Sequence, residues 1–264
     1  MKRDVKAIYF SPTRTTRTIV NTIASEISGD GYSTIDITSM ENRERSYTFD
    51  QDDLVIMGMP VYAGRIPQTV IPFLTSIKAH GTPVVPVVVY GNRDYDDALL
   101  ELSDLMKNTG FKPVAAGAFI GEHSYSRDDA PIAMDRPDHA DLEMAREFGR
   151  RIAAMLDGEP ENSIPKEPEI PGNRPYRERM QFPPVNIPVN SDSCTACDIC
   201  VEACPVDAID PDDYSQNPDK CIICCACIKQ CPENARTLKS KEINAVTERL
   251  SEKCAARKEP DIFI

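Results

Sequence analysis

The chain has 264 residues, 41% of them hydrophobic, and a formal net charge of −12. That length allows one medium-sized domain and a second, small one. The acidic balance argues against a nucleic-acid-binding protein, which needs a basic face. It favours docking on partner proteins that have basic faces.

The sequence contains no apolar run of about 18 residues, and its N-terminus has no long apolar segment. We therefore expect no membrane span and no signal peptide. We expect a cytoplasmic protein, in which disulfides are rare.

Strand and helix patterns alternate from residue 5 to residue 157. Short apolar runs typical of buried strands lie at 5–10, 33–38, 53–60, 83–90 and 114–121. Helix-period patterns lie at 16–27, 67–77, 96–108 and 140–157. Five strands alternating with helices predict an α/β domain with a doubly wound, parallel five-stranded sheet. Ligands of such sheets bind at the carboxyl ends of the strands.

A proline-rich stretch follows, with eight prolines from Pro160 to Pro188. So many prolines exclude a helix and disfavour a strand, so the stretch is predicted to be an extended, semi-rigid connector. Four larger side chains are expected to pin it to a surface: Ile164, Ile170, Tyr176 and Phe182.

The loop after the first predicted strand is rich in hydroxyl groups and opens a helix. It reads Ser11-Pro12-Thr13-Arg14-Thr15-Thr16. Backbone N–H groups at a helix N-terminus and nearby hydroxyls make such a loop a natural anion site. Ser and Thr at a helix start also serve as plain caps.

This loop resembles the phosphate loop of flavodoxins, with Arg14 in place of the family's glycine; an arginine there can pair with a phosphate dianion. Two later loops resemble those that hold the flavin ring in that family, with Tyr62 and Tyr95 at the positions of its aromatic side chains. The resemblance covers residues 3–157 and implies bound FMN. The site residues that it implies are Ser11, Thr13, Arg14, Thr15, Thr16, Pro60, Val61, Tyr62, Ala63, Gly64, Tyr90, Gly91, Asn92, Arg93 and Tyr95.

A dinucleotide site is not supported. The sequence Gly29-Asp30-Gly31 follows a predicted helix rather than a strand and lacks a third glycine, so it is interpreted as a helix stop and turn. The long segment 122–144 is a better functional candidate, because long loops at the active end of such sheets often carry function. His123 and Tyr125 directly follow the last predicted strand, and they are interpreted first as ordinary polar loop residues; the alternative is that they reach the flavin edge or the second domain.

All ten cysteines lie between Cys194 and Cys254, and eight of them form an internal repeat. Each copy has the spacing Cys-x2-Cys-x2-Cys-x3-Cys-Pro; one begins at Cys194 and the other at Cys221. A disulfide scaffold would need an oxidising compartment. Structural zinc would favour pairs of Cys-x2-Cys rather than two identical runs of four. The repeat therefore predicts iron–sulfur ligation.

The repeat resembles two-cluster bacterial ferredoxins over residues 188–238. In that pattern the fourth cysteine of each run ligates the cluster of the other run. The resemblance implies two [4Fe–4S] clusters. The first cysteine set is Cys194, Cys197, Cys200 and Cys231, and the second cysteine set is Cys204, Cys221, Cys224 and Cys227.

Two cysteines remain outside these sets. Cys225 is expected to be a small apolar filler beside a cluster, because buried free cysteine is common. Cys254 shares one face of a predicted C-terminal helix with Ile243, Val246 and Leu250, so core packing is its expected role.

Together the two halves resemble a family of flavodoxin–ferredoxin fusion proteins found in anaerobes, and the C-terminal sequence RKEPDIFI resembles that family's ending. The resemblance implies a flavodoxin-like FMN domain at 1–158, the connector at 159–187, a small α+β ferredoxin domain at 188–240, and a helix and tail at 241–264. It implies an electron carrier that passes electrons between FMN and the clusters and onward to a redox partner protein.

A flavin-dependent reductase, with its own small substrate over the FMN and the clusters as its electron supply, is the alternative. An open flavin edge would favour the carrier, whereas a lid with acid–base groups, formed by residues 122–138, would favour the reductase. A redox sensor would need an output domain, and none is apparent in the sequence.

Overall fold

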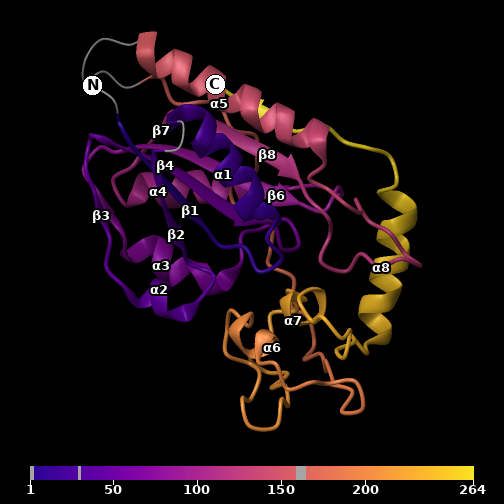
Figure 1. Ribbon diagram of the computed structural model, residues 1–264. Helices are drawn as coiled ribbons and strands as arrows, with labels where there is room; N and C mark the ends of the chain where they lie inside the picture. The colour runs from indigo at the N-terminus through magenta and orange to yellow at the C-terminus, as the bar shows by residue number, and fades with distance from the viewer. Residues whose placement is uncertain (1–2, 29–30, 159–164) are drawn as a thin grey trace.

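The computed structural model describes residues 3–28, 31–158 and 165–264. Gly29 and Asp30 of the predicted helix stop, and Pro160 and Ile164 of the predicted connector, lie outside the described residues. Figure 1 shows a layered α/β domain, a smaller unit of loops and short helices beneath it, and one helix, α8, running beside both.

The larger domain is built on a sheet whose five principal strands are parallel and run in the spatial order β2-β1-β4-β6-β8. They are β1 (Asp4–Tyr9), β2 (Tyr32–Asp36), β4 (Asp53–Pro60), β6 (Pro83–Tyr90) and β8 (Ala116–Ile120). These are the five predicted strands, in the 2-1-3-4-5 order of flavodoxin-like sheets. The prediction of a flavodoxin-like α/β fold is confirmed.

Two short strands enlarge the sheet beyond the predicted five. β7 (Lys112–Pro113) pairs with β6, and β9 (Asp261–Phe263) pairs antiparallel with β8. A separate pair joins β3 (Thr48–Phe49) to β5 (Lys78–Ala79). Strands of two or three residues are too short to give a periodic signal, so they were not predicted. Because β9 is the end of the chain, the tail returns from the cysteine-rich part to the first domain.

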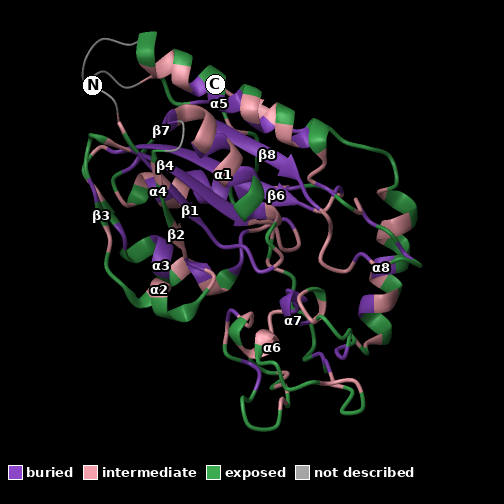
Figure 2. Cartoon of the chain, in the orientation of Figure 1, coloured by how far each residue is buried: buried purple, intermediate pink, exposed green. Residues whose placement is uncertain are grey.

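Helices cover both faces of the sheet. On one face, α1 (Thr15–Ser28) and α5 (His139–Gly158) pack on an apolar cluster that includes Ile19, Ile23 and Phe148. On the other face, a second cluster packs under η1 (Gln68–Val70), α3 (Ile71–Ser76) and α4 (Ala98–Asn108). The short helix α2 (Met40–Glu44), which has no buried residue, was not predicted. Figure 2 shows the strands buried between these layers.

The described part of the connector, residues 165–187, contains no helix or strand, as its proline content predicts. It is nevertheless held along α4. Ile170 packs against the apolar cluster on that side of the sheet, and the Tyr176 hydroxyl donates to Asp104 at 2.6 Å. Arg179 pairs with buried Glu101. The connector is thus a fixed part of the larger domain's surface.

The cysteine unit, residues 188–240, contains the short helices α6 (Ile199–Glu202) and α7 (Ala226–Lys229). Its β structure is limited to two isolated antiparallel bridges, Val189–Arg236 and Ile209–Gln216. α8 (Lys241–Lys253) follows, with the Ser240 hydroxyl accepting a hydrogen bond from the Ile243 N–H at 3.3 Å.

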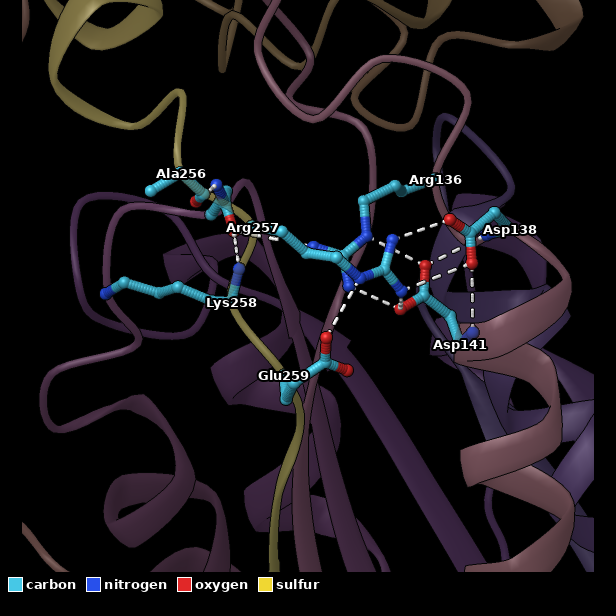
Figure 3. A network of polar contacts seen from close by, with 8 residues as sticks. Arg136, Asp138, Asp141, Ala256, Arg257, Lys258 and Glu259 are labelled. Carbon is cyan, nitrogen blue, oxygen red and sulfur yellow. Dashed lines mark hydrogen bonds and ion pairs between the residues drawn. The ribbon is translucent and has the colours of Figure 1, made fainter.

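A network of charges centred on buried Asp141 and Arg136 fastens the tail to the larger domain (Figure 3). Asp141, which is fully buried at the start of α5, accepts from Arg136 Nε at 2.8 Å and from Arg257 Nη2 at 3.0 Å. Arg257 also pairs with Asp138 and holds the pKa of that carboxyl well below its usual range. Hydrogen bonds and ion pairs therefore join the loop after β8, α5 and the C-terminal tail.

None of the helices that the structure describes is both long and apolar enough to cross a membrane.

Candidate functional site

A cavity of about 570 Å³ lies at the carboxyl ends of β1, β4, β6 and β8. This is the edge at which ligands of doubly wound sheets bind. Twelve of the fifteen predicted FMN-site residues line it: Ser11, Thr13, Thr15, Thr16, Pro60, Val61, Tyr62, Ala63, Gly64, Tyr90, Gly91 and Arg93. The sheet topology thus brings together three loops that are far apart in the chain.

The loop after β1 has the features of an anion site. Thr16 is buried in the first turn of α1, and its hydroxyl has no hydrogen-bond partner among the described residues. The Ser11 hydroxyl accepts from the backbone N–H of Arg17 at 3.0 Å, which ties the loop to the helix start. A buried hydroxyl without a partner is costly, so Thr16 is suited to a ligand atom in the cavity.

Arg14 behaves differently from the prediction. Its backbone has φ 69°, the left-handed conformation that glycine adopts most easily, so the loop geometry survives the substitution. Its side chain does not line the cavity; Nη2 donates to Gln230 Oε1 of the cysteine unit at 2.8 Å. The structure therefore gives Arg14 a contact between the two parts of the chain, and its pairing with a phosphate stays a prediction.

Tyr95, predicted to lie against the flavin ring, is also outside the cavity wall. It is buried in the apolar cluster beside Tyr90, with ring centroids 5.5 Å apart. Burial, and then the nearby Asp261 carboxylate of β9, raise the pKa of Tyr95. The C-terminal tail therefore lies beside the Tyr95 side chain. The order of residues along the chain does not reveal this contact.

Asn92 is the third predicted site residue that does not line the cavity. Its side-chain amide donates to the carbonyls of Cys254 at 2.6 Å and Ala256 at 2.8 Å. Its Oδ1 accepts from the backbone N–H of Lys258 at 3.2 Å. Asn92 thus fastens the loop after β6 to the C-terminal tail.

The loop after β8 supplies a wall that includes His123 and Tyr125. His123 Nδ1 accepts from the backbone N–H of Tyr125 at 3.0 Å, and the two rings meet edge to face. Gly91 makes room for the imidazole, since a Cβ there would lie 2.3 Å from His123 Cδ2. Burial, with the charges of Lys229 and Arg93, lowers the pKa of His123 to about 4. The neutral ring then carries its proton on Nε2.

Two tyrosines connect the cavity to the second cysteine set. Burial raises the pKa of Tyr62 well above its usual value, and the nearby thiols of Cys224 and Cys225 raise it further. Burial and the same group of cysteines also raise the pKa of Tyr125. Both tyrosines therefore lie between the loops of the sheet edge and the cysteine loop.

Several lining residues come from segments that were not predicted to form the site. The connector contributes residues 179–184, the cysteine unit residues 218–223, and α8 contributes Val246, Arg249 and Leu250. Phe182 had been expected to pin the connector to a surface, and its large apolar side chain was the available signal. Together these segments cover the cavity, so Val246 and Leu250 are cavity residues rather than plain core residues.

The first cysteine set surrounds a small cavity in the cysteine unit. Cys194, Cys197 and Cys200 line it together with Cys231 of the other run. This is the crossed arrangement that the ferredoxin resemblance implies. Cys197 is exposed, whereas the other three are partly buried.

The second cysteine set lies deeper in the cysteine unit. Cys204, Cys221 and Cys227 pack in or against one apolar cluster. Burial raises the pKa of Cys224, and Cys227, Cys204 and Cys221 are close enough to raise it further. Cys221 also lines the large cavity, so the large cavity and the second cysteine set share a wall.

All ten cysteines are free thiols in the structure. Within residues 3–28, 31–158 and 165–264, no three His, Cys, Asp or Glu side chains converge tightly enough to hold a single metal ion.

Cys225 and Cys254 differ in environment. Cys225 is buried at the start of α7, and its Sγ lies 3.7 Å from the carbonyl oxygen of Ile223. Its burial agrees with the expectation of a small filler; its lack of a ligand role stays a prediction. Cys254 is only partly buried, at the end of α8.

Lys229, the last residue of α7, and Gln230, which follows it, attach the cysteine unit to the edge of the sheet. Lys229 Nζ donates to Glu122 Oε1 at 2.5 Å and to the Ser126 carbonyl at 2.7 Å. Gln230 Nε2 donates to the Pro12 carbonyl at 2.8 Å. Because these residues lie between Cys227 and Cys231, the predicted cluster ligands are fixed close to two loops of the large cavity.

Comparisons with known proteins match two separate parts of the chain. A family profile described as a flavodoxin domain matches residues 7–129, and one described as a 4Fe-4S binding domain matches residues 187–210. A flavodoxin domain implies a flavin, and a 4Fe-4S domain implies at least one [4Fe–4S] cluster. The chain therefore combines a flavodoxin-like domain with an iron–sulfur domain, a pairing that supports a role in electron transfer.

Solved structures similar to the chain include a flavodoxin from the domain Archaea (12% identity, 58% of this chain, 99% of that chain, TM-score 0.38). A Streptococcus pneumonia TIGR4 flavodoxin is similar at 16% identity over 57% of this chain and 98% of that chain, with a TM-score of 0.40. An NADH:FMN oxidoreductase in its apo form is similar at 14% identity over 62% of this chain and 95% of that chain, with a TM-score of 0.43. No curated protein sequence matches the chain.

Proposed function

We propose that the chain is an electron-transfer protein that holds FMN in the large cavity and two [4Fe–4S] clusters in the cysteine unit. Bound FMN takes up one or two electrons and each cluster one, so together they interconvert two-electron and one-electron transfers. The observation that carries the proposal is the shared wall: Cys221, a predicted cluster ligand, lines the same cavity as twelve predicted FMN-site residues.

The residues around the large cavity fit FMN. The loop from Ser11 to Thr16 would hold the phosphate, with the unpartnered Thr16 hydroxyl as one donor. Tyr62, His123 and Tyr125 offer flat faces for the ring. The neutral His123 supplies a donor in the cavity wall.

The second cysteine set would hold the cluster nearer to the flavin, since Cys221 is in the cavity wall. The first set, with exposed Cys197, would hold the cluster nearer to solvent and to a partner protein. No basic residue occurs from 181 to 219, and this stretch has eight exposed acidic residues: Asp192, Asp198, Glu202, Asp207, Asp210, Asp212, Asp213 and Asp219. A redox partner with a basic docking face is the complement of this surface.

The contacts of Lys229 and Gln230 would keep the two parts at a fixed separation. Electron exchange inside one chain then does not depend on a diffusional encounter. The connector along α4 and the tail in the sheet fasten the cysteine unit at both of its ends.

The decisive experiment uses protein purified without oxygen. We expect about eight irons and one FMN per chain. Cys204→Ser should damage the cluster of the second set while leaving that of the first, and electron paramagnetic resonance should show one perturbed cluster. Cys225→Ala is the control and should leave both signals intact. Stoichiometric zinc without acid-labile sulfide, or FAD in place of FMN, would contradict the proposal.

A flavin-dependent reductase is the second candidate, favoured by one observation. The large cavity is covered by the connector, the cysteine unit and α8, and His123 and Tyr125 lie in its wall. Photoreduced protein should separate the two candidates under anaerobic conditions. Rapid reoxidation by small conjugated carbonyl compounds would support the reductase, and reoxidation only by protein acceptors would support the carrier.

A further inference from the structure

Arg236 is a buried arginine without an acidic partner. Its side chain is only 2% exposed, and it is among the largest fully buried side chains in the described part of the chain. Nη1 donates to the Ile187 carbonyl at 3.2 Å and Nη2 to the Tyr214 carbonyl at 2.6 Å. Within the residues that the structure describes, Nε has no partner and no carboxylate pairs with the guanidinium.

Such a side chain needs an explanation. A guanidinium stays charged in proteins and has five N–H donors, and burying a charge without a counter-charge is strongly unfavourable. Two carbonyl oxygens satisfy hydrogen bonds but do not neutralise the charge. Asp198 and Glu233 line the same small cavity, but among the described residues neither forms an ion pair with the guanidinium, so Arg236 still lacks a counter-charge in direct contact.

The position of Arg236 indicates which anion. Arg236 lines the small cavity together with all four members of the first cysteine set. Arg236 thus lies against the first cysteine set.

The internal repeat supplies a comparison within the same chain. Five residues after the last cysteine of each run, the first copy has Ile209 and the second has Arg236. The surrounding contacts are equivalent. The backbone N–H of Ala208 donates to Cys204 Sγ at 3.2 Å, and that of Ala235 donates to Cys231 Sγ at 3.3 Å.

Both positions also form an isolated antiparallel bridge, to Gln216 for Ile209 and to Val189 for Arg236. Ile209 is buried in the apolar cluster of the cysteine unit. An apolar side chain therefore satisfies the packing at this position of the repeat, and packing alone does not account for the charge at 236.

We propose that Arg236 is the buried counter-charge of the cluster held by the first cysteine set, and that it makes the two clusters unequal. This inference rests on the proposed function. Reduction adds negative charge to a cluster that its thiolates already make anionic, and a fixed buried cation stabilises that charge. Net charge near a cluster is one of the determinants of its reduction potential, so Arg236 raises the potential of the first cluster above that of the second.

The test is the substitution Arg236→Ile, which places at position 236 the residue that the first copy of the repeat has at the equivalent position, Ile209. Redox titration of each cluster, followed by electron paramagnetic resonance, should show the equilibrium constant for reduction of the first cluster falling at least tenfold. For a one-electron couple, tenfold corresponds to 59 mV. The second cluster should shift less. Arg236→Lys, which keeps a positive charge, should restore most of the potential.

Lys239→Gln is the matched control, because it removes one positive charge from the same segment at an exposed position. Water and salt screen that charge, so both potentials should stay unchanged. Clusters present in Arg236→Ile with unchanged potentials would overturn the inference.

Two further outcomes are also decisive. If Arg236→Ile fails to assemble the first cluster, a near-native potential in Arg236→Lys supports the counter-charge, whereas loss of the cluster in Arg236→Lys as well overturns it. Absence of iron and sulfide from the unmodified protein would instead refute the proposed function itself, so the two failures are distinguishable.

Discussion

The flavodoxin-like domain and the cysteine unit are held together by different means. In the described residues, the two faces of the sheet bury apolar clusters of 24 and 18 residues, whereas the cluster that includes the cysteine unit has six, and only Ile209, Ile223 and Cys227 of these lie within residues 188–240. Figure 2 shows the same contrast, with buried strands in the upper domain and a mainly exposed or intermediate chain below. An apolar core of that size can stabilise a domain alone, but a unit of about 50 residues with so few core residues needs another source of stability, such as a metal centre.

The difference teaches that one ligand site is fixed by the fold around it, whereas the fold around the other depends on its ligands. The large cavity is formed by strand ends whose positions the sheet already fixes. The cysteine sets are on loops that have only short helices and isolated bridges around them. FMN would bind to a preformed site, whereas the clusters would complete the fold of the unit that binds them.

The largest effect should come from removing one ligand of each predicted cluster in Cys204→Ser/Cys231→Ser. We expect amide hydrogens in residues 188–238 to exchange rapidly because the unit loses its stabilising centres, while those of β4 and β6 stay protected. Hydrogen exchange followed by mass spectrometry measures both regions in one sample. Cys225→Ala should resemble the unmodified protein, and protection of residues 188–238 in the double variant would refute the contrast between the two regions.

The next effect concerns the tail, which belongs structurally to the sheet. Asp141→Asn removes the carboxylate that holds Arg136 and Arg257. Breaking a buried ion pair costs about 3–5 kcal/mol, so urea denaturation of the flavodoxin-like domain should show a loss of that order. Glu259→Gln removes an exposed partner of Arg257 and should cost no more than about 1 kcal/mol. Equal effects of the two substitutions would mean that the network does not fasten the tail.

A smaller effect should appear at the predicted phosphate site. Thr16→Val removes a buried hydroxyl that has no partner in the described chain, so the stability of the FMN-free protein should not fall. Its FMN affinity should fall by about tenfold or more, since a hydrogen bond to a charged group contributes about 1.5–3 kcal/mol. Fluorescence titration of FMN measures the affinity. Thr22→Val changes an exposed hydroxyl further along α1 and is the control; unchanged FMN affinity in Thr16→Val would place the phosphate elsewhere.

The smallest effect should be the pH dependence of the loop after β8. The pKa of His123 is lowered from 6.5 to about 4, first by burial and then by Lys229 and Arg93. Because the unfolded chain binds the proton more readily, the stabilising effect is present above pH 6.5 and is lost as the pH falls toward 4. After allowance for partial exposure, we expect a loss of about 1 kcal/mol. Between pH 7 and pH 5, His123→Gln should lose about 1 kcal/mol less stability than the unmodified protein, as measured by urea denaturation. The same pH dependence in both proteins would contradict a lowered pKa of His123.

The five principal strands and both cysteine runs could be predicted because their signals are local. A buried strand such as Pro83–Tyr90 is a continuous apolar run, and the cysteine spacings lie within about eleven residues each. The three cavity loops could also be located, since the carboxyl ends of parallel strands share one edge. Tyr95 does not line the cavity, because its ring packs toward Tyr90 and β9, and its contact with a flavin ring stays a prediction.

Local pattern therefore defines which residues form the principal strands and helices and the two cysteine runs, since each of those features depends on neighbours along the chain. The tertiary structure alone decides that the tail pairs with β8, that Asn92 binds the tail, and that the connector covers the cavity. It also reveals that Arg236 and Ile209 occupy equivalent places in the repeat with and without a charge. These features join residues far apart in the chain, and such contacts depend on how whole elements pack, which no short stretch of sequence encodes.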